Sequence, residues 1–168
     1  MSDMQMAAAT ATKYTTTTDR QSDREVVITR TFDGPARIVF MAWTTPELLM
    51  KWWTPASFGI TFISCEADVR TGGTYRFVMG HPDFDQPMTF HGKYLEVVPN
   101  KKLVWTNEEG EPGSVTTVTF EEKDGKTHLV LSDMHPSKAA LDEELASGAI
   151  SGYPEQFNQL DILLKSLR

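Results

Sequence analysis

The chain of 168 residues has the length of one domain, and chains of about 150 residues bury about 70% of their unfolded surface without disulfides or metals. Its 23 acidic and 16 basic side chains give a net charge of −7, which disfavours binding to a phosphate backbone or an anionic membrane. A hydrophobic fraction of 40% is that of a folded globular protein, so we expect one core and no nucleic-acid partner.

No segment has the features of a membrane span or a secretion signal. Runs of about 18 apolar residues do not occur, and the apolar residues 6–9 follow no basic residue. We therefore expect a soluble, cytoplasmic protein. Cys65 is the only cysteine, so no internal disulfide can form, and we expect it to be buried and inert as a small core residue.

The first 23 residues are rich in alanine, threonine and serine and hold few side chains that could pack. This composition predicts a flexible tail over residues 1–23 and a folded domain over residues 24–168. The first strand is expected near Glu25, where Val26, Ile28 and Phe32 alternate with polar neighbours.

Two short helices are predicted after this strand. Pro35 suits the first turn of the first helix, which carries apolar residues over 38–43. The second helix is expected to begin after Thr45, because Pro46 suits the first helical position and Glu47 the first turn.

Six further strands are predicted, over residues 61–69, 73–80, 88–98, 102–107, 114–122 and 126–133, because each segment is rich in β-branched and aromatic residues and is bounded by turn residues. Consecutive strands joined by short turns should form an antiparallel meander. The interior face that alternation predicts carries Tyr75, Phe77, Met79, Phe90, Tyr94, Leu103, Trp105, Val118, Phe120, Leu129 and Leu131.

The chain ends in two predicted helices, over residues 137–147 and from about 152 to 167, with a break at Gly148. Apolar residues of the second helix recur at helical spacing and form one stripe: Tyr153, Phe157, Leu160, Leu164 and Leu167. This stripe should pack on the sheet, while Asp161 and Lys165 face water.

Several motifs in this order of elements resemble those of the START-like or SRPBCC superfamily, and more narrowly the branch named after the activator of the heat-shock protein 90 ATPase. These motifs are Ala42-Trp43, Thr45-Pro46-Glu47 and Trp52-Trp53 in the helices, Glu66 and Asp68 followed by residues 70–79, residues 91–99 and 102–106 in the strands, and Gly152-Tyr153 in the last helix. The resemblance covers about residues 25–168, although Tyr153 stands where tryptophan is expected in many relatives.

The resemblance implies an α+β helix-grip fold. In this fold a curved antiparallel sheet, here of about seven strands, wraps around a long C-terminal helix, and two short helices follow the first strand. Members of the superfamily include lipid carriers, polyketide cyclases, aromatases and co-chaperone modules. The resemblance therefore implies a cavity between sheet and helix.

The leading functional hypothesis is non-catalytic binding of a hydrophobic or aromatic small molecule in that cavity. The expected lining residues are mostly aromatic: Trp43, Trp53, Phe77, Met79, Phe90, Tyr94, Trp105, Tyr153 and Phe157. The alternative is that these side chains fill the core and leave no cavity.

Two other functions stay open. The branch name implies a co-chaperone-like activator of a heat-shock protein ATPase with a role in stress response. A polyketide cyclase or aromatase-like enzyme would need an acid or base, for which Glu66 and Asp133 are candidates. The direction of Glu66 stays open, because its strand can be entered in either register.

The remaining polar candidates have ordinary interpretations. Asp133 ends a strand, so it could meet a ligand or cap the next turn. Alternation places His91 on the surface, and we expect His135, which precedes a proline, to be solvated.

We expect no cofactor, no metal and no catalytic residue. His81, Asp83 and Asp85 are metal-binding residue types, but no further ligand follows at a recognisable spacing. No GxSxG, HExxH, CxxC or phosphate-loop pattern occurs. The expected partner is a hydrophobic small molecule, with a chaperone as the alternative, and the chain should be a monomer or a homodimer.

Overall fold

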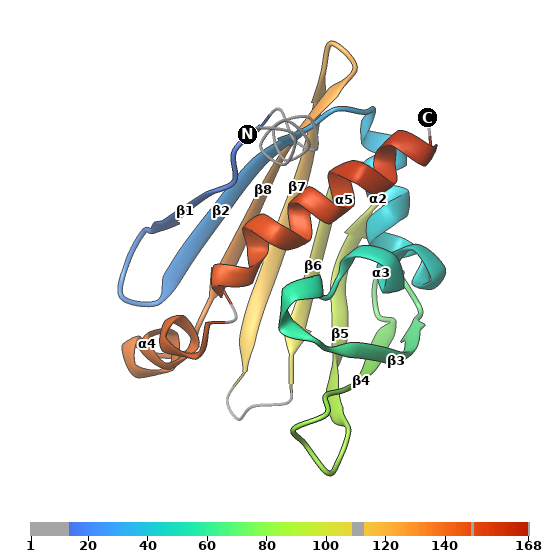
Figure 1. The fold of residues 1–168 in the computed structure, drawn as a ribbon. Helices are drawn as coiled ribbons and strands as arrows, with labels where there is room; N and C mark the ends of the chain where they lie inside the picture. The colour runs from blue at the N-terminus through green and yellow to red at the C-terminus, as the bar shows by residue number, and fades with distance from the viewer. Residues whose placement is uncertain (1–13, 109–112, 149, 168) are drawn as a thin grey trace, which may run out of the picture.

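A computed structural model of the chain describes residues 14–108, 113–148 and 150–167. Its eight strands form one antiparallel sheet. The helix α5 (Tyr153–Leu167) runs diagonally across one face of this curved sheet, as Figure 1 shows. The predicted α+β helix-grip fold is confirmed.

The strands that the sequence predicts are β2 (Glu25–Phe32), β3 (Thr61–Ala67), β4 (Thr74–Gly80), β5 (Met88–Val98), β6 (Lys102–Asn107), β7 (Ser114–Lys123) and β8 (Lys126–Met134). From β3 to β8 each strand pairs antiparallel with the next, which is the expected meander. On its other side β8 pairs with β2, so that Val26 lies opposite Asp133. The first predicted strand thus joins the sheet beside the last.

An additional edge strand, β1 (Thr17–Arg20), lies within the segment that we expect to be a tail, and it raises the strand count from about seven to eight. It pairs antiparallel with β2, from Thr17 opposite Thr29 to Arg20 opposite Val26. All four residues of β1 are exposed. Backbone hydrogen bonds therefore hold this strand, and an apolar pattern could not indicate it. Residues 1–13 of the expected tail lie outside the described residues.

The helices α2 (Ala36–Thr44) and α3 (Pro46–Trp52) follow β2 as predicted, and a single turn η1 (Ala56–Phe58) leads into β3. The helix α4 (Lys138–Ser147) and the turn η2 (Ile150–Gly152) precede α5. In Figure 1, α2 lies beside the C-terminal half of α5, and α4 lies near the N-terminal end of α5. Within the described ranges, no helix is long and apolar enough to cross a membrane.

The core lies between the sheet and the helices α2, α3 and α5. The predicted interior face of the sheet is buried, except that Phe90 is half-buried. On α5, the stripe residues Phe157, Leu160 and Leu164 are fully buried. The helical and strand periodicities therefore identify the two surfaces that meet in the core.

The expectation that Asp161 faces water is wrong. This residue is 4% exposed, and its Oδ2 lies 3.3 Å from Nη2 of Arg30, which is 1% exposed. Arg30 also donates to Asn158 Oδ1 at 3.1 Å and lies over the ring of Phe32. The pair joins α5 to β2. Hydrophobic periodicity does not reveal it, because the partner charge comes from a strand far away in the sequence.

A bulge in β3 between Phe62 and Ser64 decides which way this strand faces. Both Phe62 and Cys65 pack against the core, whereas Ile63 is 52% exposed. The side chain of Glu66 is 72% exposed, and its Oε2 lies 3.7 Å from Nη1 of Arg76. Glu66 therefore points away from the core. Cys65 is half-buried rather than buried, and burial raises the pKa of its thiol to about 11.

Candidate functional site

An apolar cavity of about 90 Å³, which we call the inner cavity, lies between the sheet and the helices α2 and α3. Six of the nine residues expected to line a ligand cavity border it: Trp43, Trp53, Phe77, Phe90, Tyr94 and Trp105. Leu49, Tyr75, Leu103 and Asn107 complete its wall. Met79 and Phe157 are buried in the core and are not among the residues that line it.

Trp43 stands at the centre of the aromatic cluster around this cavity. Its ring centroid lies 4.8 Å from that of Trp52, 5.8 Å from that of Trp53 and 6.0 Å from that of Trp105. The first two pairs are edge-to-face, the arrangement that aromatic quadrupoles favour. Trp43 Nε1 is buried and has no hydrogen-bond partner among the described residues.

A larger cleft of about 630 Å³, which we call the outer cleft, adjoins the inner cavity and shares Trp53, Trp105 and Asn107 with it. Tyr153, the seventh expected lining residue, lies here. The other lining residues come mostly from β7, α4 and the segment after β8: Gly113, Ser114, Thr116, Asp133, His135, Pro136, Ser137, Ala139, Ala140, Glu143, Glu144 and Ser147.

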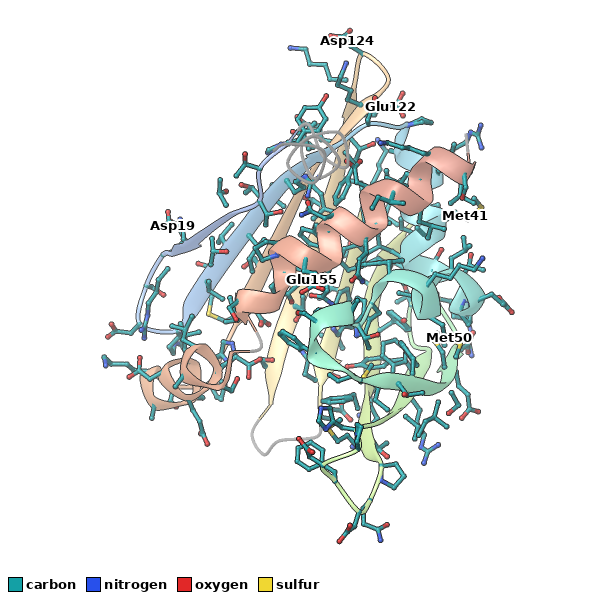
Figure 2. All side chains as sticks on the ribbon, viewed as in Figure 1. Asp19, Met41, Met50, Glu122, Asp124 and Glu155 are labelled. Atoms are coloured by element: carbon teal, nitrogen blue, oxygen red, sulfur yellow. The ribbon has the colours of Figure 1, made fainter. Side chains whose placement is uncertain are left out.

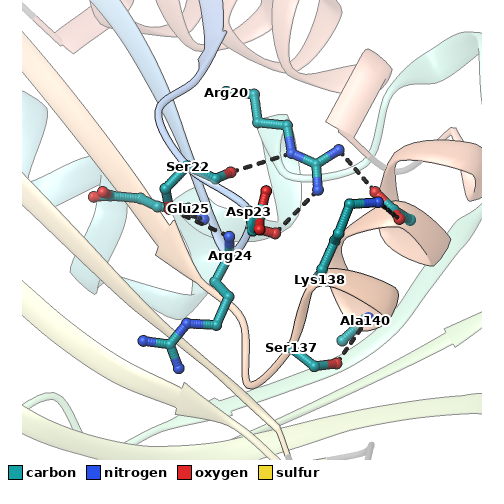
Figure 3. A network of polar contacts seen from close by, with 9 residues as sticks. Arg20, Ser22, Asp23, Arg24, Glu25, Ser137, Lys138 and Ala140 are labelled. Atoms are coloured by element: carbon teal, nitrogen blue, oxygen red, sulfur yellow. Dashed lines mark hydrogen bonds and ion pairs between the residues drawn. The ribbon is translucent and has the colours of Figure 1, made fainter.

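The helix α4 forms one wall of the outer cleft and is anchored at its N-terminal end. Ser137 Oγ accepts a hydrogen bond from Ala140 N at 3.1 Å, which caps the helix. Asp142 Oδ1 lies 2.7 Å from Nη1 of Arg20 in β1, and Asp142 Oδ2 accepts from Lys138 Nζ at 2.8 Å. Figure 3 shows how this network joins β1 to α4. Edge strand and helix thus position each other.

A chain of hydrogen bonds joins the two spaces through Asn107. Asn107 Oδ1 accepts from Trp105 Nε1 at 3.3 Å, and the Tyr75 hydroxyl lies 3.2 Å from the same oxygen. Asn107 Nδ2 donates to Thr116 Oγ1 at 3.0 Å, and the Thr116 hydroxyl donates to Asp133 Oδ1 at 2.8 Å. The bond to Asn107 Oδ1 holds the Trp105 ring in the shared wall.

The chain of hydrogen bonds ends at a buried pair of titratable side chains. Asp133 is 5% exposed and His135 is 6% exposed. His135 Nε2 lies 3.4 Å from Asp133 Oδ2 but makes no well-aligned hydrogen bond to any described residue. The polar contact with Asp133 raises the pKa of His135, although burial by itself would lower it.

The expectation that His135 is solvated is wrong. This residue is 6% exposed in the connection between β8 and α4, and its backbone N donates to the carbonyl oxygen of Arg24 at 2.7 Å. Asp133 borders the outer cleft, and the helix that follows is capped by Ser137. Tyr153 lies in the same wall, and burial together with the charges of Asp133 and Glu144 raises the pKa of its hydroxyl.

The other polar candidates lie elsewhere. Glu66 borders neither the inner cavity nor the outer cleft. His91 is exposed, as alternation predicts. His81 Nδ1 lies 3.6 Å from Asp83 Oδ2, but the described residues contain no group of three or more histidine, cysteine or acidic side chains placed to hold a metal ion.

Comparison with known proteins identifies the family. The family described as "Activator of Hsp90 ATPase homolog 1-like protein" has a sequence model that matches residues 33–165. The chain belongs to this family. The matched segment begins before α2 and ends within α5, so it contains every element that borders the inner cavity and the outer cleft.

Solved structures show the same architecture as this member of the Activator of Hsp90 ATPase homolog 1-like family. A protein from Nitrosomonas europaea is 25% identical, with a TM-score of 0.78 over 87% of this chain and 97% of that chain. A protein from Mycobacterium smegmatis is 26% identical, with a TM-score of 0.77 over 92% and 99%. A Rhodobacter sphaeroides protein, 21% identical with a TM-score of 0.83 over 91% and 99%, shows the fold alone. A search of curated proteins found none that matches the sequence.

Sequence reasoning missed most of the outer cleft. Thr116 comes from a strand and His135 from a connection, and no spacing relates the two. A signal did exist for Tyr75 and Leu103, which share the alternation of Phe77 and Trp105 and therefore face the inner cavity with them.

Proposed function

We propose that the chain binds a small apolar or aromatic molecule between the sheet and the helices, without catalysing a reaction. The observation that supports this proposal is the aromatic inner cavity, which adjoins the larger outer cleft through shared residues. The inner cavity of about 90 Å³ is smaller than an engineered core cavity of roughly 150 Å³ that binds benzene. The ligand therefore places one small apolar group there, and the remainder lies in the outer cleft.

The first experiment is native mass spectrometry of the untagged protein, with extraction and identification of any bound molecule. A stoichiometric apolar adduct is the expected result. The site is then tested by filling the inner cavity with the variant Leu49→Phe, since Leu49 is 1% exposed and lines it. Binding of the extracted molecule should weaken at least tenfold, because the added ring atoms occupy the space of the ligand.

A matched control for this variant is Leu95→Phe, since Leu95 is 49% exposed and lines neither space. Leu95→Phe should bind as the parent does. Leu103→Phe provides a second filling variant if Leu49→Phe does not fold, because Leu103 also borders the inner cavity. If a folded filling variant keeps the affinity of the parent, the inner cavity is not the binding site.

A second candidate is an enzyme of the polyketide cyclase or aromatase type. The observation that favours it is the pair of Asp133 and His135 in the outer cleft, since a buried acid beside a histidine can transfer protons. Incubation of the extracted molecule with excess protein, followed by mass spectrometry, separates enzyme from carrier. Conversion that Asp133→Asn abolishes would establish catalysis, and recovery of the unchanged molecule would favour the carrier.

A third candidate is stimulation of a heat-shock protein ATPase, which rests on the description of the family. The test adds the purified chain to a purified chaperone and follows ATP hydrolysis. Stimulation that saturates with the concentration of the chain would support this function. An unchanged rate at a several-fold molar excess would exclude it for the chaperone tested.

A further inference from the structure

The outer cleft combines aromatic rings with carboxylates. Trp53, Trp105 and Tyr153 border it, and so do Asp133, Glu143 and Glu144. Among the described residues that line the cleft, none is lysine or arginine. The one basic side chain is His135, which faces Asp133. Even with this imidazole protonated, the walls carry an excess of negative charge.

This combination favours an organic cation over an anion. The faces of tryptophan and tyrosine rings attract an ammonium group through their quadrupole, and carboxylates attract it through charge. A carboxylate or phosphate group would instead meet like charges in a partly buried space. Electrostatic complementarity thus narrows the chemistry of the polar end of the ligand.

The pair of Asp133 and His135 provides a second, independent indication. Both side chains are at least nine-tenths buried, and both line the cleft. His135 Nε2 has no well-aligned partner, and its distance to Asp133 Oδ2 is 3.4 Å. Asp133 Oδ2 has two lone pairs, so it can accept from an ammonium group in the cleft while it also faces the imidazole.

We propose that the outer cleft binds the ammonium group of an amphipathic organic amine whose apolar end enters the inner cavity. The residues shared by the two spaces, Trp53, Trp105 and Asn107, allow one molecule to reach both. The proposal rests on the proposed function, because it names the class of the small molecule that this same site takes.

Three probes of equal chain length, each with a narrow alkyl end that the inner cavity can take, test the chemistry: hexylamine, 1-hexanol and hexanoate. Each is titrated into the untagged protein at neutral pH and low salt, with binding followed by calorimetry and by tryptophan fluorescence. The amine should bind at least tenfold more tightly than the alcohol, and the carboxylate more weakly than both. An alcohol that binds as tightly as the amine would overturn this inference and leave the apolar site intact.

Failure of the proposed function gives a different result. In that case none of the three probes binds, and Leu49→Phe does not change the affinity for the extracted molecule. Both the apolar site and this inference would then be wrong. If Leu49→Phe binds the amine as tightly as the parent does, the apolar end of the amine does not occupy the inner cavity. This result would contradict the proposal.

Charge variants test the location of the ammonium group. The double variant Glu143→Gln/Glu144→Gln keeps the size of both side chains in α4 and removes their charge. Affinity for the amine should fall roughly five- to tenfold, while affinity for the alcohol stays unchanged. Circular dichroism verifies the fold.

The control carries the same change in net charge at a distant place. Glu121 and Asp124 are exposed and belong to the hairpin of β7 and β8, and Figure 2 shows Asp124 at its tip, far from the Glu155 end of α5. Glu121→Gln/Asp124→Asn should bind the amine as the parent does. An equal loss in this control would show that net charge, and not the cleft, attracts the amine, and would overturn the proposal.

Discussion

The buried pair of Asp133 and His135 makes the stability of the folded state depend on pH. The polar contact with Asp133 raises the pKa of His135 in the folded state above its ordinary value of 6.5. The folded state then holds the proton more strongly than the unfolded state does. The resulting stabilisation is complete below the unfolded pKa and is lost as the pH rises through the folded pKa.

The first prediction follows from the direction of this pKa shift. The free energy of unfolding should decrease between about pH 6 and pH 8, and this decrease should shrink in His135→Gln. Urea unfolding at a series of pH values measures it. His128→Gln is the control, since His128 is exposed on β8. The same pH dependence in parent and His135→Gln would mean that the pair does not contribute it.

The buried ion pair between Arg30 and Asp161 is the second residue-scale feature with a measurable consequence. Burial lowers the pKa of Arg30, although the Asp161 charge opposes this effect, and burial raises the pKa of Asp161 against the charge of Arg30. For both groups burial is the larger cause. The net contribution of the pair to the free energy of unfolding is therefore small. Removal of one partner costs more than this contribution, because a lone charge would then remain in the core.

We predict that Arg30→Ala lowers the free energy of unfolding by about 3–5 kcal/mol, since it leaves Asp161 buried without its partner. Replacement of both residues, in Arg30→Met/Asp161→Leu, should cost much less. Urea denaturation of both variants gives the comparison. Equal losses in the single and the double variant would contradict the account of an isolated buried charge.

At the scale of elements, β1 and α4 show what a local pattern misses and what it captures. The strand β1 is held by backbone pairing and by the ion pair between Arg20 and Asp142, and neither leaves an apolar signal. The helix α4 was predictable from Ser137 and Gly148, because cap chemistry depends only on nearby residues. Its role as a wall of the outer cleft was not.

Loss of the cap should loosen α4 alone. We predict that Ser137→Ala destabilises this helix by about 1 kcal/mol, which corresponds to about fivefold faster amide exchange across residues 138–147. Hydrogen exchange with mass spectrometry measures it. Ser166→Ala is the control, because the Ser166 hydroxyl donates to a carbonyl within α5 and caps no N-terminus. Equal acceleration in the strands would show that α4 does not open independently.

At the scale of the whole molecule, α5 and the sheet form one cooperative unit. Leu160 is fully buried against the sheet, whereas Ile162 on the same helix is 53% exposed. Gln159 Nε2 further donates to the carbonyl oxygens of Trp52 at 3.0 Å and Thr54 at 2.9 Å, which ties α5 to the end of α3. Weakening the helix interface should therefore unfold the entire domain.

We predict that Leu160→Ala lowers the free energy of unfolding by about 2–5 kcal/mol, while Ile162→Ala changes it by less than about 0.5 kcal/mol. Far-ultraviolet circular dichroism and tryptophan fluorescence should give coincident transitions in both variants, as two-state unfolding requires. Separate transitions would show that the helix detaches before the sheet unfolds.

The sequence by itself determined the order of the elements from β2 onward, the interior face of the sheet and the apolar stripe of α5. Alternation, helical spacing and turn residues are local properties, and burial enforces them along each element. This is why Phe77 and Trp105 could be assigned to the inner cavity. The tertiary structure alone decided that Asp133 meets His135, that Arg30 meets Asp161, and that a bulge turns Glu66 outward. Those outcomes depend on which distant segments pack together, and charged side chains carry no periodic signal of their partners.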